Sequence, residues 1–502
     1  MKTISLKISY FFKRELIILY SLILIGSYLR LPGVFTDSFA FTYDVGRDLL
    51  AVSNIIESHK IPLIGATTGL PGVFYGPWWY YLLTPLLIVS FDNPQGIALA
   101  MVLFGIFSII LSYVVGNKIG GKFLGIFLAG LATVSPVMIS LSSQIWNPNI
   151  APFLVLLVLL VLNRIFSKEE NLSKYYFLLG ILLALNMDIE IIFGLFLSVG
   201  VIISVVLIKK KNVRFREIFY FLMGGIIILA PRIIFELRHQ FLMTNSFLKF
   251  LLNGEVSRSV GLTQLIMDRG NMLFNFFNST VALNSKLFGL ILIIFIVISL
   301  ALFYKKLSSR ERNFTVTSII VILTFFMGTV FFRHDIWSHY LVGLPVFFIL
   351  ILGMSINLIS KKFKTFIFSS IIFAIIFLVN LNIPMIVSGV NKPLWEGDAA
   401  VYRNQLSVID YVYKDADGKK FKYVVYTPPV YDYTYQYLFK WYGPKKYKYS
   451  SSINANLAYF ILEPDFQNPK RLTDWLKKRE GDGRIIKSEK VKGGIIVQTR
   501  IN

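Results

Sequence analysis

The sequence contains no cysteine, four histidines and few charged residues. The absence of cysteine excludes disulfide bonds, thiolate metal sites and cysteine nucleophiles. Charged residues make up 16% of the 502 residues and hydrophobic residues 55%, against about 25% and 45–50% in soluble domains. Acidic residues are scarce, 28 against 51 lysines and arginines. In a soluble protein this excess would suggest nucleic-acid binding, but the apolar runs are too long for a globular core. The sequence therefore predicts an α-helical polytopic membrane protein without a nucleic-acid partner.

Eleven apolar stretches approach the roughly 17–25 residues that a membrane-spanning helix needs. They cover residues 16–31, 96–116, 123–141, 150–166, 175–185, 191–208, 215–235, 287–304, 314–332, 339–359 and 366–387. A twelfth run, residues 77–91, is short, contains two prolines and opens with four aromatic residues. Such a run is typical of an interfacial or re-entrant segment, and we predict that it does not cross the membrane.

Six short basic loops determine the predicted orientation. They are residues 2–14, 118–122, 164–174, 209–216, 305–312 and 361–364, with 21 basic residues against five acidic residues in or beside them. Short loops rich in lysine and arginine stay in the cytoplasm. If all six do so, an even number of spans separates each from the next, which holds for eleven spans. The sequence therefore predicts a multi-pass plasma-membrane protein with a cytoplasmic N-terminus and an extracytoplasmic C-terminus.

The stretch from residue 175 to 208 has basic residues at both ends, so it must turn on the outer side. As one helix its 34 residues would be about 51 Å long, too long for one crossing. We predict that the turn lies in "NMDIE", residues 186–190.

Two domains are expected. Residues 1–388 form the transmembrane domain, with a first outer loop at 32–95, and residues 389–502 form a small extracytoplasmic α/β domain. In the second, the strand-like runs "KYVVYTP", "LAYFILEP" and "GGIIVQTRI" alternate with the helix-like "NPKRLTDWLKK" and with turn signals.

The first outer loop carries candidate catalytic residues. In "FTYDVGRDLLAVSNIIESHK" the apolar residues repeat at helical spacing, which predicts an amphipathic helix in the membrane interface. Asp44 lies near its start, Asp48 follows on the same face, and Arg47 is adjacent. These residues either serve chemistry or form a helix cap with a surface ion pair.

Three further outer segments carry polar candidates. Asn147 lies in "SLSSQIWNPNIAPF", where a helix-start turn is the simpler interpretation. Asp188 and Glu190 lie at the bilayer edge, where ionisable groups often mark function. The end of the 215–235 span supplies Arg232, Arg238 and His239. These three residues either hold a phosphate or form an interfacial collar, and Arg232 has the right spacing to pair with Glu236.

The sequence leaves a divalent metal site open and disfavours a transporter. Three of the four histidines fall on the outer side, so a divalent metal site is possible, but no spacing specifies one. The centres of the predicted spans are nearly free of polar residues, whereas a transporter tends to place them at midspan in broken helices. The polar residues instead gather at an outward-facing rim, as chemistry on a lipid-linked substrate requires.

Four motifs resemble a known family. "YDVGRDLLAVSNIIESHKIPLIG", "YGPWWYYLLTPLL", "LSSQIWNPNIAPF" and "FELRH" look like those of the bacterial polyprenyl-phosphate-sugar-dependent membrane glycosyltransferases of the C-type fold. These are relatives of protein O-mannosyltransferases and of the lipid A aminoarabinose transferase. The resemblance covers about residues 15–390 and includes the motif order and the eleven-span topology.

The resemblance implies a reaction and roles. An acceptor hydroxyl, on a lipid, protein or cell-envelope glycan, would attack the anomeric carbon of a polyprenyl-phosphate-linked sugar with inversion. Asp44 would be the general base, supported by Arg47 and Asp48. The substrate- and phosphate-binding candidates are Arg232, Arg238, His239, Asp188, Glu190, Asn147 and Tyr81, although Tyr81 is as well explained as a packing residue. Many relatives have a second Asp where this chain has Asn147 and Asn149, which argues against a two-carboxylate metal site.

Three alternatives remain. A glycan ligase or polymerase would use a diphosphate-linked donor. A lipid-linked sugar flippase or permease would translocate its substrate without Asp44. A surface scaffold would act through residues 389–502 alone.

Overall fold

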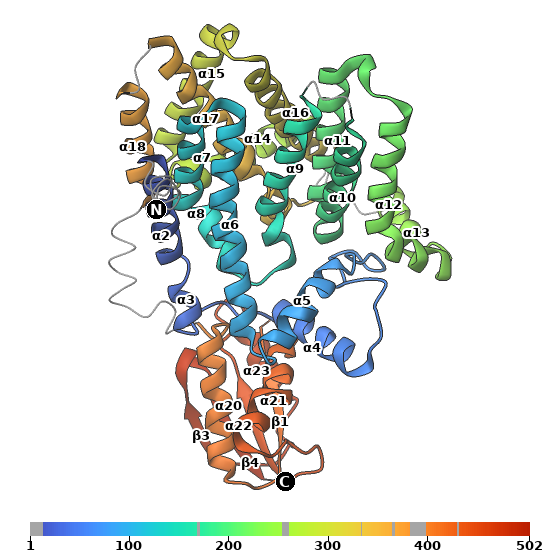
Figure 1. Cartoon of the computed structure of the whole chain (residues 1–502). Helices are drawn as coiled ribbons and strands as arrows, with labels where there is room; N and C mark the ends of the chain where they lie inside the picture. The colour runs from blue at the N-terminus through green and yellow to red at the C-terminus, as the bar shows by residue number, and fades with distance from the viewer. Residues whose placement is uncertain are drawn as a thin grey trace, which may run out of the picture.

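The computed structural model describes residues 14–167, 171–253, 261–332, 334–363, 367–381, 398–428 and 431–501. A bundle of long helices stands above a smaller C-terminal domain, with the helices of the first outer loop between them (Figure 1). The predicted cytoplasmic residues 2–13 and the predicted domain boundary at 388–389 lie outside the described residues.

Every predicted apolar stretch is mostly helical within the described residues. The bundle helices are α2 (Arg14–Tyr28), α6 (Pro94–Gly120), α7 (Lys122–Val134), α8 (Pro136–Ser142), α9 (Ala151–Ile165), α10 (Ser173–Ile189), α11 (Ile191–Lys209), α12 (Phe215–Arg238), α15 (Lys286–Phe303), α16 (Ser309–Phe331), α17 (Leu344–Phe363) and α18 (Ile367–Leu381). The turn in 186–190 is confirmed, since the extended residue Glu190 separates α10 from α11.

Length and composition support a polytopic membrane protein. Among the described residues, eight helices are long and apolar enough to cross a membrane, or nine if α7 and α8 form one broken span bent by 64°. Two predicted spans are shorter: α10 has 17 residues and α18 has 15. The total of eleven crossings therefore stays a prediction.

Two helices were not predicted, α13 (Leu242–Asn253) and α14 (Leu262–Val281). α14 packs against α15, α16 and α17, but charged and amide side chains along it lower its hydropathy below that of a span. One of them, Arg269, is buried and donates to the carbonyl oxygens of Thr329 (3.1 Å) and His334 (2.7 Å). These carbonyls lie at and beyond the end of α16, so the side chain serves as their hydrogen-bond partner.

The first outer loop forms α3 (Pro32–Phe35), α4 (Tyr43–Ser58) and α5 (Trp78–Val89). The amphipathic helix predicted after residue 42 is confirmed as α4, and its apolar face is covered by protein, since it packs against α5 and α21 (Tyr433–Lys440). Two of the four aromatic residues that open the 77–91 run, Trp79 and Tyr80, are buried and donate hydrogen bonds to Asp48.

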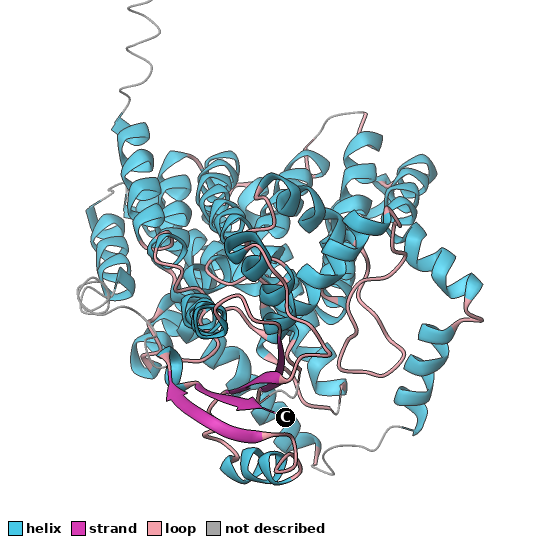
Figure 2. Ribbon diagram, turned by 90° about the horizontal axis from the view of Figure 1, so that it is seen from below, coloured by secondary structure: helices cyan, strands magenta, loops and turns pink. Residues whose placement is uncertain are grey.

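The C-terminal domain is a four-stranded mixed sheet with helices. Its strands are β1 (Phe421–Tyr426), β2 (Leu457–Leu462), β3 (Arg484–Lys490) and β4 (Ile496–Ile501), in the order β1-β2-β4-β3. β1 and β2 are parallel and the other pairs antiparallel; Figure 2 shows the sheet from below. The helices are α20 (Tyr402–Ala416), α21, α22 (Tyr442–Tyr447) and α23 (Pro469–Lys477). The predicted α/β class, three strands and α23 are confirmed, whereas β3, α20, α21 and α22 were not predicted.

The C-terminal domain is joined to the first outer loop through the backbone. Ala40 and Val401 form an antiparallel bridge, flanked by the bonds Phe41 N–H to Ala400 O (2.7 Å) and Tyr402 N–H to Phe39 O (3.1 Å). This short pairing seats the C-terminal domain directly beside the start of α4, where Asp44 lies.

Gly46 allows α4 and α21 to approach each other closely. A Cβ atom there would lie closer than van der Waals contact to the backbone of Tyr433 and Thr434. We expect Gly46→Ala to destabilise the joint by about 1–3 kcal/mol, as overpacking does. Limited proteolysis should then release the C-terminal domain faster. Gly33→Ala is the matched control, because nothing lies within 4 Å of that Cβ position; equal proteolysis of both variants would contradict the expectation.

Candidate active site

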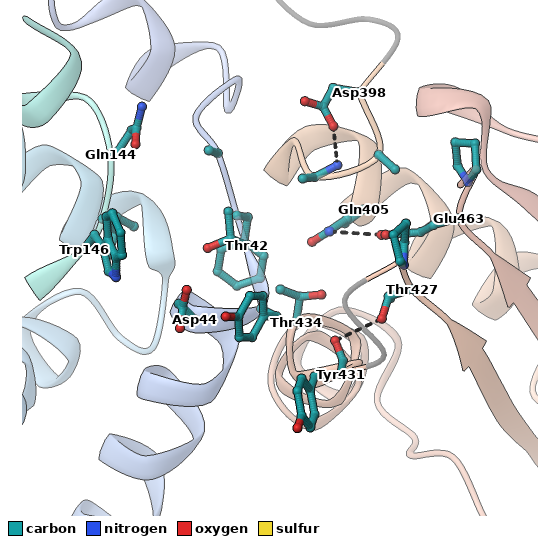
Figure 3. Close-up of a pocket in the computed structure, with 18 of the residues that line it drawn as sticks. Thr42, Asp44, Gln144, Trp146, Asp398, Gln405, Thr427, Tyr431, Thr434 and Glu463 are labelled. Carbon is teal, nitrogen blue, oxygen red and sulfur yellow. Dashed lines mark hydrogen bonds between the residues drawn. The ribbon is translucent and has the colours of Figure 1, made fainter. Parts of the chain in front are cut away.

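A cavity of about 640 Å³ lies between the bundle and the C-terminal domain. Its walls come from the start of α4, from the loop after α8, and from the C-terminal domain (Figure 3). The polar side chains on these walls are Thr42, Tyr43, Asp44, Gln144, Trp146, Asp398, Gln405, Thr427, Tyr431, Thr434 and Glu463. The cavity thus joins residues from both ends of the sequence.

Asp44 lies on the wall of this cavity, in the first turn of α4. Its side chain is 20% exposed, and one carboxylate oxygen pairs with Arg47 Nη1 at 2.8 Å. Burial raises the pKa of Asp44 above its ordinary value, and Arg47 partly offsets this rise. A partly exposed carboxylate that is held by a cation and faces a cavity is suited to accept a proton from a bound ligand.

Asp48 is placed differently from Asp44. It is 3% exposed, and its carboxylate accepts bonds from Arg47 Nε (2.9 Å), Trp79 Nε1 (2.9 Å) and Tyr80 Oη (3.4 Å). Burial raises its pKa to about 6, against the lowering effect of Arg47. Asp48 is not among the residues that line the cavity, so it positions Arg47, which in turn holds Asp44. The predicted proximity of the three side chains is confirmed, since Arg47 pairs with both carboxylates. Their catalytic roles stay predictions.

The opposite wall belongs to the C-terminal domain. Glu463 follows β2, is 6% exposed and accepts bonds from Tyr435 Oη (2.9 Å) and Gln405 Nε2 (3.4 Å). Burial raises the pKa of Glu463 to about 7. Glu463, Gln405 and the other residues of this wall were not predicted from the sequence. One signal in the sequence was available: Glu463 is a charged residue directly after the strand run "LAYFIL". Binding and catalytic residues often lie on loops that follow such rigid elements.

A second polar cluster lies near the C-terminal ends of α10 and α12. Asp188 is fully buried and accepts bonds from the Trp78 backbone N–H (3.0 Å) and Arg232 Nη2 (3.2 Å). The predicted pairing of Arg232 with Glu236 is wrong, because Glu236 accepts bonds from the backbone N–H groups of residues 243 and 244 instead. Within the described residues, the carboxylate that Arg232 pairs with is that of Asp188.

The cluster reaches toward the cavity through aromatic residues. Tyr75 Oη donates to Glu190 at 3.1 Å. Burial raises the pKa of Tyr75, and the charges of Glu190 and then of Asp44 raise it further. His339 lies 3.9 Å from Glu190 and contacts Trp146 edge-on at 4.9 Å between ring centroids. Trp146 also lines the cavity, so the two groups of residues are neighbours.

The remaining candidates lie outside the cavity wall. The Asn147 side chain is buried and donates to the Ile189 carbonyl, which links the loop after α8 to the end of α10. Tyr81 Oη donates to the Pro62 carbonyl, which favours packing. Arg238 and His239 are exposed at the C-terminal end of α12, where the His239 ring stacks on Phe235 at 4.1 Å between centroids.

Metal binding gains no support from the geometry. In the part of the chain that the structure describes, no group of three or more His, Asp or Glu side chains is arranged to hold a metal ion. The side chains of Asn147 and Asn149 donate to backbone carbonyls.

Comparison with known proteins identifies the fold. No protein-family model matches the sequence, and no curated protein matches it. Among solved structures, the chain is similar to ArnT from Cupriavidus metallidurans bound to undecaprenyl phosphate, with 10% identity over 96% of this chain and 97% of that chain and a TM-score of 0.58. The apo state of ArnT gives a TM-score of 0.59 over the same coverage.

A looser similarity is to the oligosaccharyltransferase of Archaeoglobus fulgidus in complex with zinc and sulfate. It shows 12% identity over 88% of this chain and 67% of that chain, with a TM-score of 0.47. The ArnT match covers the bundle and the C-terminal domain together. This multi-pass membrane protein therefore has the C-type glycosyltransferase fold, as its motifs predict.

Proposed function

We propose that this protein is a membrane glycosyltransferase. It would move a sugar from a polyprenyl-phosphate donor to a hydroxyl acceptor at the outer face of the plasma membrane. The N-terminus would be cytoplasmic and the C-terminal domain, residues 389–502, extracytoplasmic. The observation that carries the proposal is the position of Asp44. It faces the cavity between the bundle and the C-terminal domain and pairs with Arg47, in a fold shared with ArnT. The structure of ArnT with undecaprenyl phosphate supports the same class of donor.

The proposed reaction is an inverting displacement. The acceptor oxygen forms a bond with the anomeric carbon, the bond between that carbon and the phosphate oxygen breaks, and polyprenyl phosphate leaves with the electron pair. Asp44 takes the acceptor proton, which typically contributes about 10²–10⁴-fold to the rate. Arg47 keeps the carboxylate oriented. Asp48 accepts a hydrogen bond from Arg47, and Trp79 and Tyr80 donate to Asp48 in turn. The remainder of the rate comes from positioning and charge stabilisation.

The first test is donor turnover. The full-length protein in nanodiscs is incubated with a panel of polyprenyl-phosphate sugars and polyprenyl-diphosphate sugars, with a crude envelope extract as the source of acceptors. Release of free polyprenyl phosphate from one monophosphate donor, dependent on the extract, is the expected result. Turnover of diphosphate donors alone would indicate a glycan ligase instead. Binding of a donor without turnover of any would contradict the proposal and favour a flippase.

Arg238 is the proposed ligand of the donor phosphate, since Arg232 is bound to Asp188 whereas Arg238 is exposed at the outer end of α12. We expect Arg238→Gln to raise the KM for the donor about tenfold and leave kcat nearly unchanged, because a charge-assisted hydrogen bond contributes about 1.5–3 kcal/mol. Steady-state kinetics of polyprenyl phosphate release measure this. Arg216→Gln, an exposed arginine at the other end of α12, is the control. An unchanged KM would remove Arg238 from the site.

A further inference from the structure

The C-terminal domain presents hydrogen-bond acceptors to the cavity, opposite Asp44. Glu463 receives both of its side-chain hydrogen bonds on Oε1, so among the described residues Oε2 has no donor. Gln405 donates to Glu463 through Nε2, while its own Oε1 is buried without a partner. Figure 3 shows this carboxylate–amide pair on the side of the cavity away from Asp44. An unpartnered buried amide oxygen costs free energy, which a bound donor would recover.

The charges on the cavity wall have one sign. Asp44, Asp398 and Glu463 line the cavity, and no lysine, arginine or histidine is among the described residues that line it. Phosphate and carboxylate groups bind where cations and N–H donors converge. Beside Glu463 Oε2, the Gln405 Oε1 atom is an acceptor without a donor among the described residues. Together with the three carboxylates, these acceptors would repel an anion and accept bonds from hydroxyl or ammonium groups.

Aromatic side chains complete the wall. Trp146, Tyr43 and Tyr431 line the cavity, and the rings of Tyr43 and Tyr431 stack at 5.9 Å between centroids. Phe466, at 83% exposure, adds another apolar surface. Aromatic rings provide flat apolar faces against which a sugar ring can pack, and their π-faces attract ammonium groups.

We propose that the wall formed by Glu463 and Gln405 binds the acceptor, and that this acceptor is a glycan segment rich in hydroxyl groups, uncharged or amine-bearing, without phosphate or carboxylate at the bound position. This inference rests on the proposed function, because it assigns the acceptor half of that reaction. It also places the donor phosphate outside this wall.

Binding measurements test the proposal without a donor. The full-length protein in nanodiscs is titrated by calorimetry with three probes of equal length: tri-glucosamine, tri-N-acetylglucosamine and tri-galacturonic acid. We expect the cationic tri-glucosamine to bind most tightly, the neutral tri-N-acetylglucosamine less tightly and the anionic tri-galacturonic acid most weakly. The affinities of the first and the last should differ by at least about tenfold. Glu463→Gln keeps the size of the side chain and removes its charge, so it should reduce this difference by about tenfold, since a hydrogen bond to a charged group contributes at least about 1.5 kcal/mol.

Glu480→Gln is the control, because it removes the same charge from an exposed position of the same domain; it should leave all three affinities unchanged. Gln405→Leu should weaken the neutral probe, and its circular dichroism shows whether the domain is still folded. The proposal would be overturned by equal affinities for the three probes, by tightest binding of tri-galacturonic acid, or by absence of binding of all three. It would also be overturned if Glu463→Gln left the order of affinities unaltered. Donor turnover reports on the proposed function separately, so turnover without this binding order would overturn the acceptor assignment alone.

Discussion

Asp44→Asn is expected to lower kcat for polyprenyl phosphate release by about 10²–10⁴-fold, the usual contribution of a general base. The donor Kd should change little, because Arg47 and the cavity wall keep their positions: Arg47 retains Asp48, with 2.9 Å between Nη2 and Oδ1. Measuring kcat by single turnover and Kd by calorimetry separates the two effects. A kcat within threefold of wild type would remove Asp44 from the proposed role.

The pH dependence of the reaction gives a second readout for Asp44. A general base works only when ionised, so the rate should fall as the pH decreases through its pKa. Burial raises that pKa above the ordinary value of 3.8, and the fall should begin at a correspondingly higher pH. Asp48 titrates beside it with a pKa of about 6, and both contact Arg47, so the observed value belongs to the coupled group. Asp44→Asn should flatten the acid limb.

Asp37→Asn provides the matched control for these measurements. Asp37 lies in the same outer loop but outside the cavity wall, and its backbone is in the left-handed region (φ 53°), which asparagine tolerates. The substitution therefore removes one carboxylate charge with little strain. Rates and pH profiles like those of wild type are expected. A loss equal to that of Asp44→Asn would indicate a general charge effect in the loop.

The bundle could be predicted from sequence because its signal is local. Apolar length identifies spans, and the basic residues that flank them indicate which ends share a side. α4 was predictable for the same reason, since Val45, Leu49 and Val52 repeat at helical spacing and are all buried. α14 was missed because a helix whose buried residues include polar ones gives no continuous apolar run. The carbonyls near the end of α16 satisfy one of these buried polar side chains, Arg269.

The candidate site could be predicted only where it lies on one element. Asp44, Arg47 and Asp48 share α4, so their grouping followed from spacing alone. The partners of Asp188 are Arg232 and Trp78, which come from distant segments, and no spacing encodes such a pair. Glu463 reaches the cavity only because the backbone bridge at Ala40 and Val401 seats the C-terminal domain there. Strand β3 is exposed along its whole length, so it lacks the alternation that reveals a half-buried strand.

Arg30→Leu is expected to cause a large loss of stability. Arg30 is buried at the end of α2, and it donates to the carbonyls of Ala132 (2.9 Å) and Thr133 (3.0 Å) and to Ser142 Oγ (2.9 Å). The chain bends between α7 and α8 at this point, and Pro136 has no N–H to donate. The guanidinium therefore satisfies carbonyls that the break leaves without helical partners.

The expected cost follows from these hydrogen bonds. Interhelical hydrogen bonds in membrane proteins average about 0.6 kcal/mol and reach about 1.7 kcal/mol. Losing the three bonds to α7 and α8, together with the local bond to the Gly26 carbonyl, should therefore cost about 2–4 kcal/mol. The entropy of unfolding is about 2.1 cal/mol/K per residue, so in a chain of 502 residues a thermal shift of the protein in nanodiscs should show Tm lowered by about 2–4 °C. Arg30→Lys should lose less, because one ammonium replaces part of the network. Arg216→Leu, at an exposed site, should leave Tm unchanged.

The same substitution should affect the cavity. α8 leads directly into the loop that carries Gln144 and Trp146 on the cavity wall. The bend that Arg30 stabilises therefore also determines the position of this loop. We expect Arg30→Leu to weaken binding of tri-N-acetylglucosamine at temperatures well below its lowered Tm, whereas Arg30→Lys should retain more of it. A lowered Tm with wild-type probe affinity would limit Arg30 to stability. An unchanged Tm would mean that the bend between α7 and α8 holds without the guanidinium.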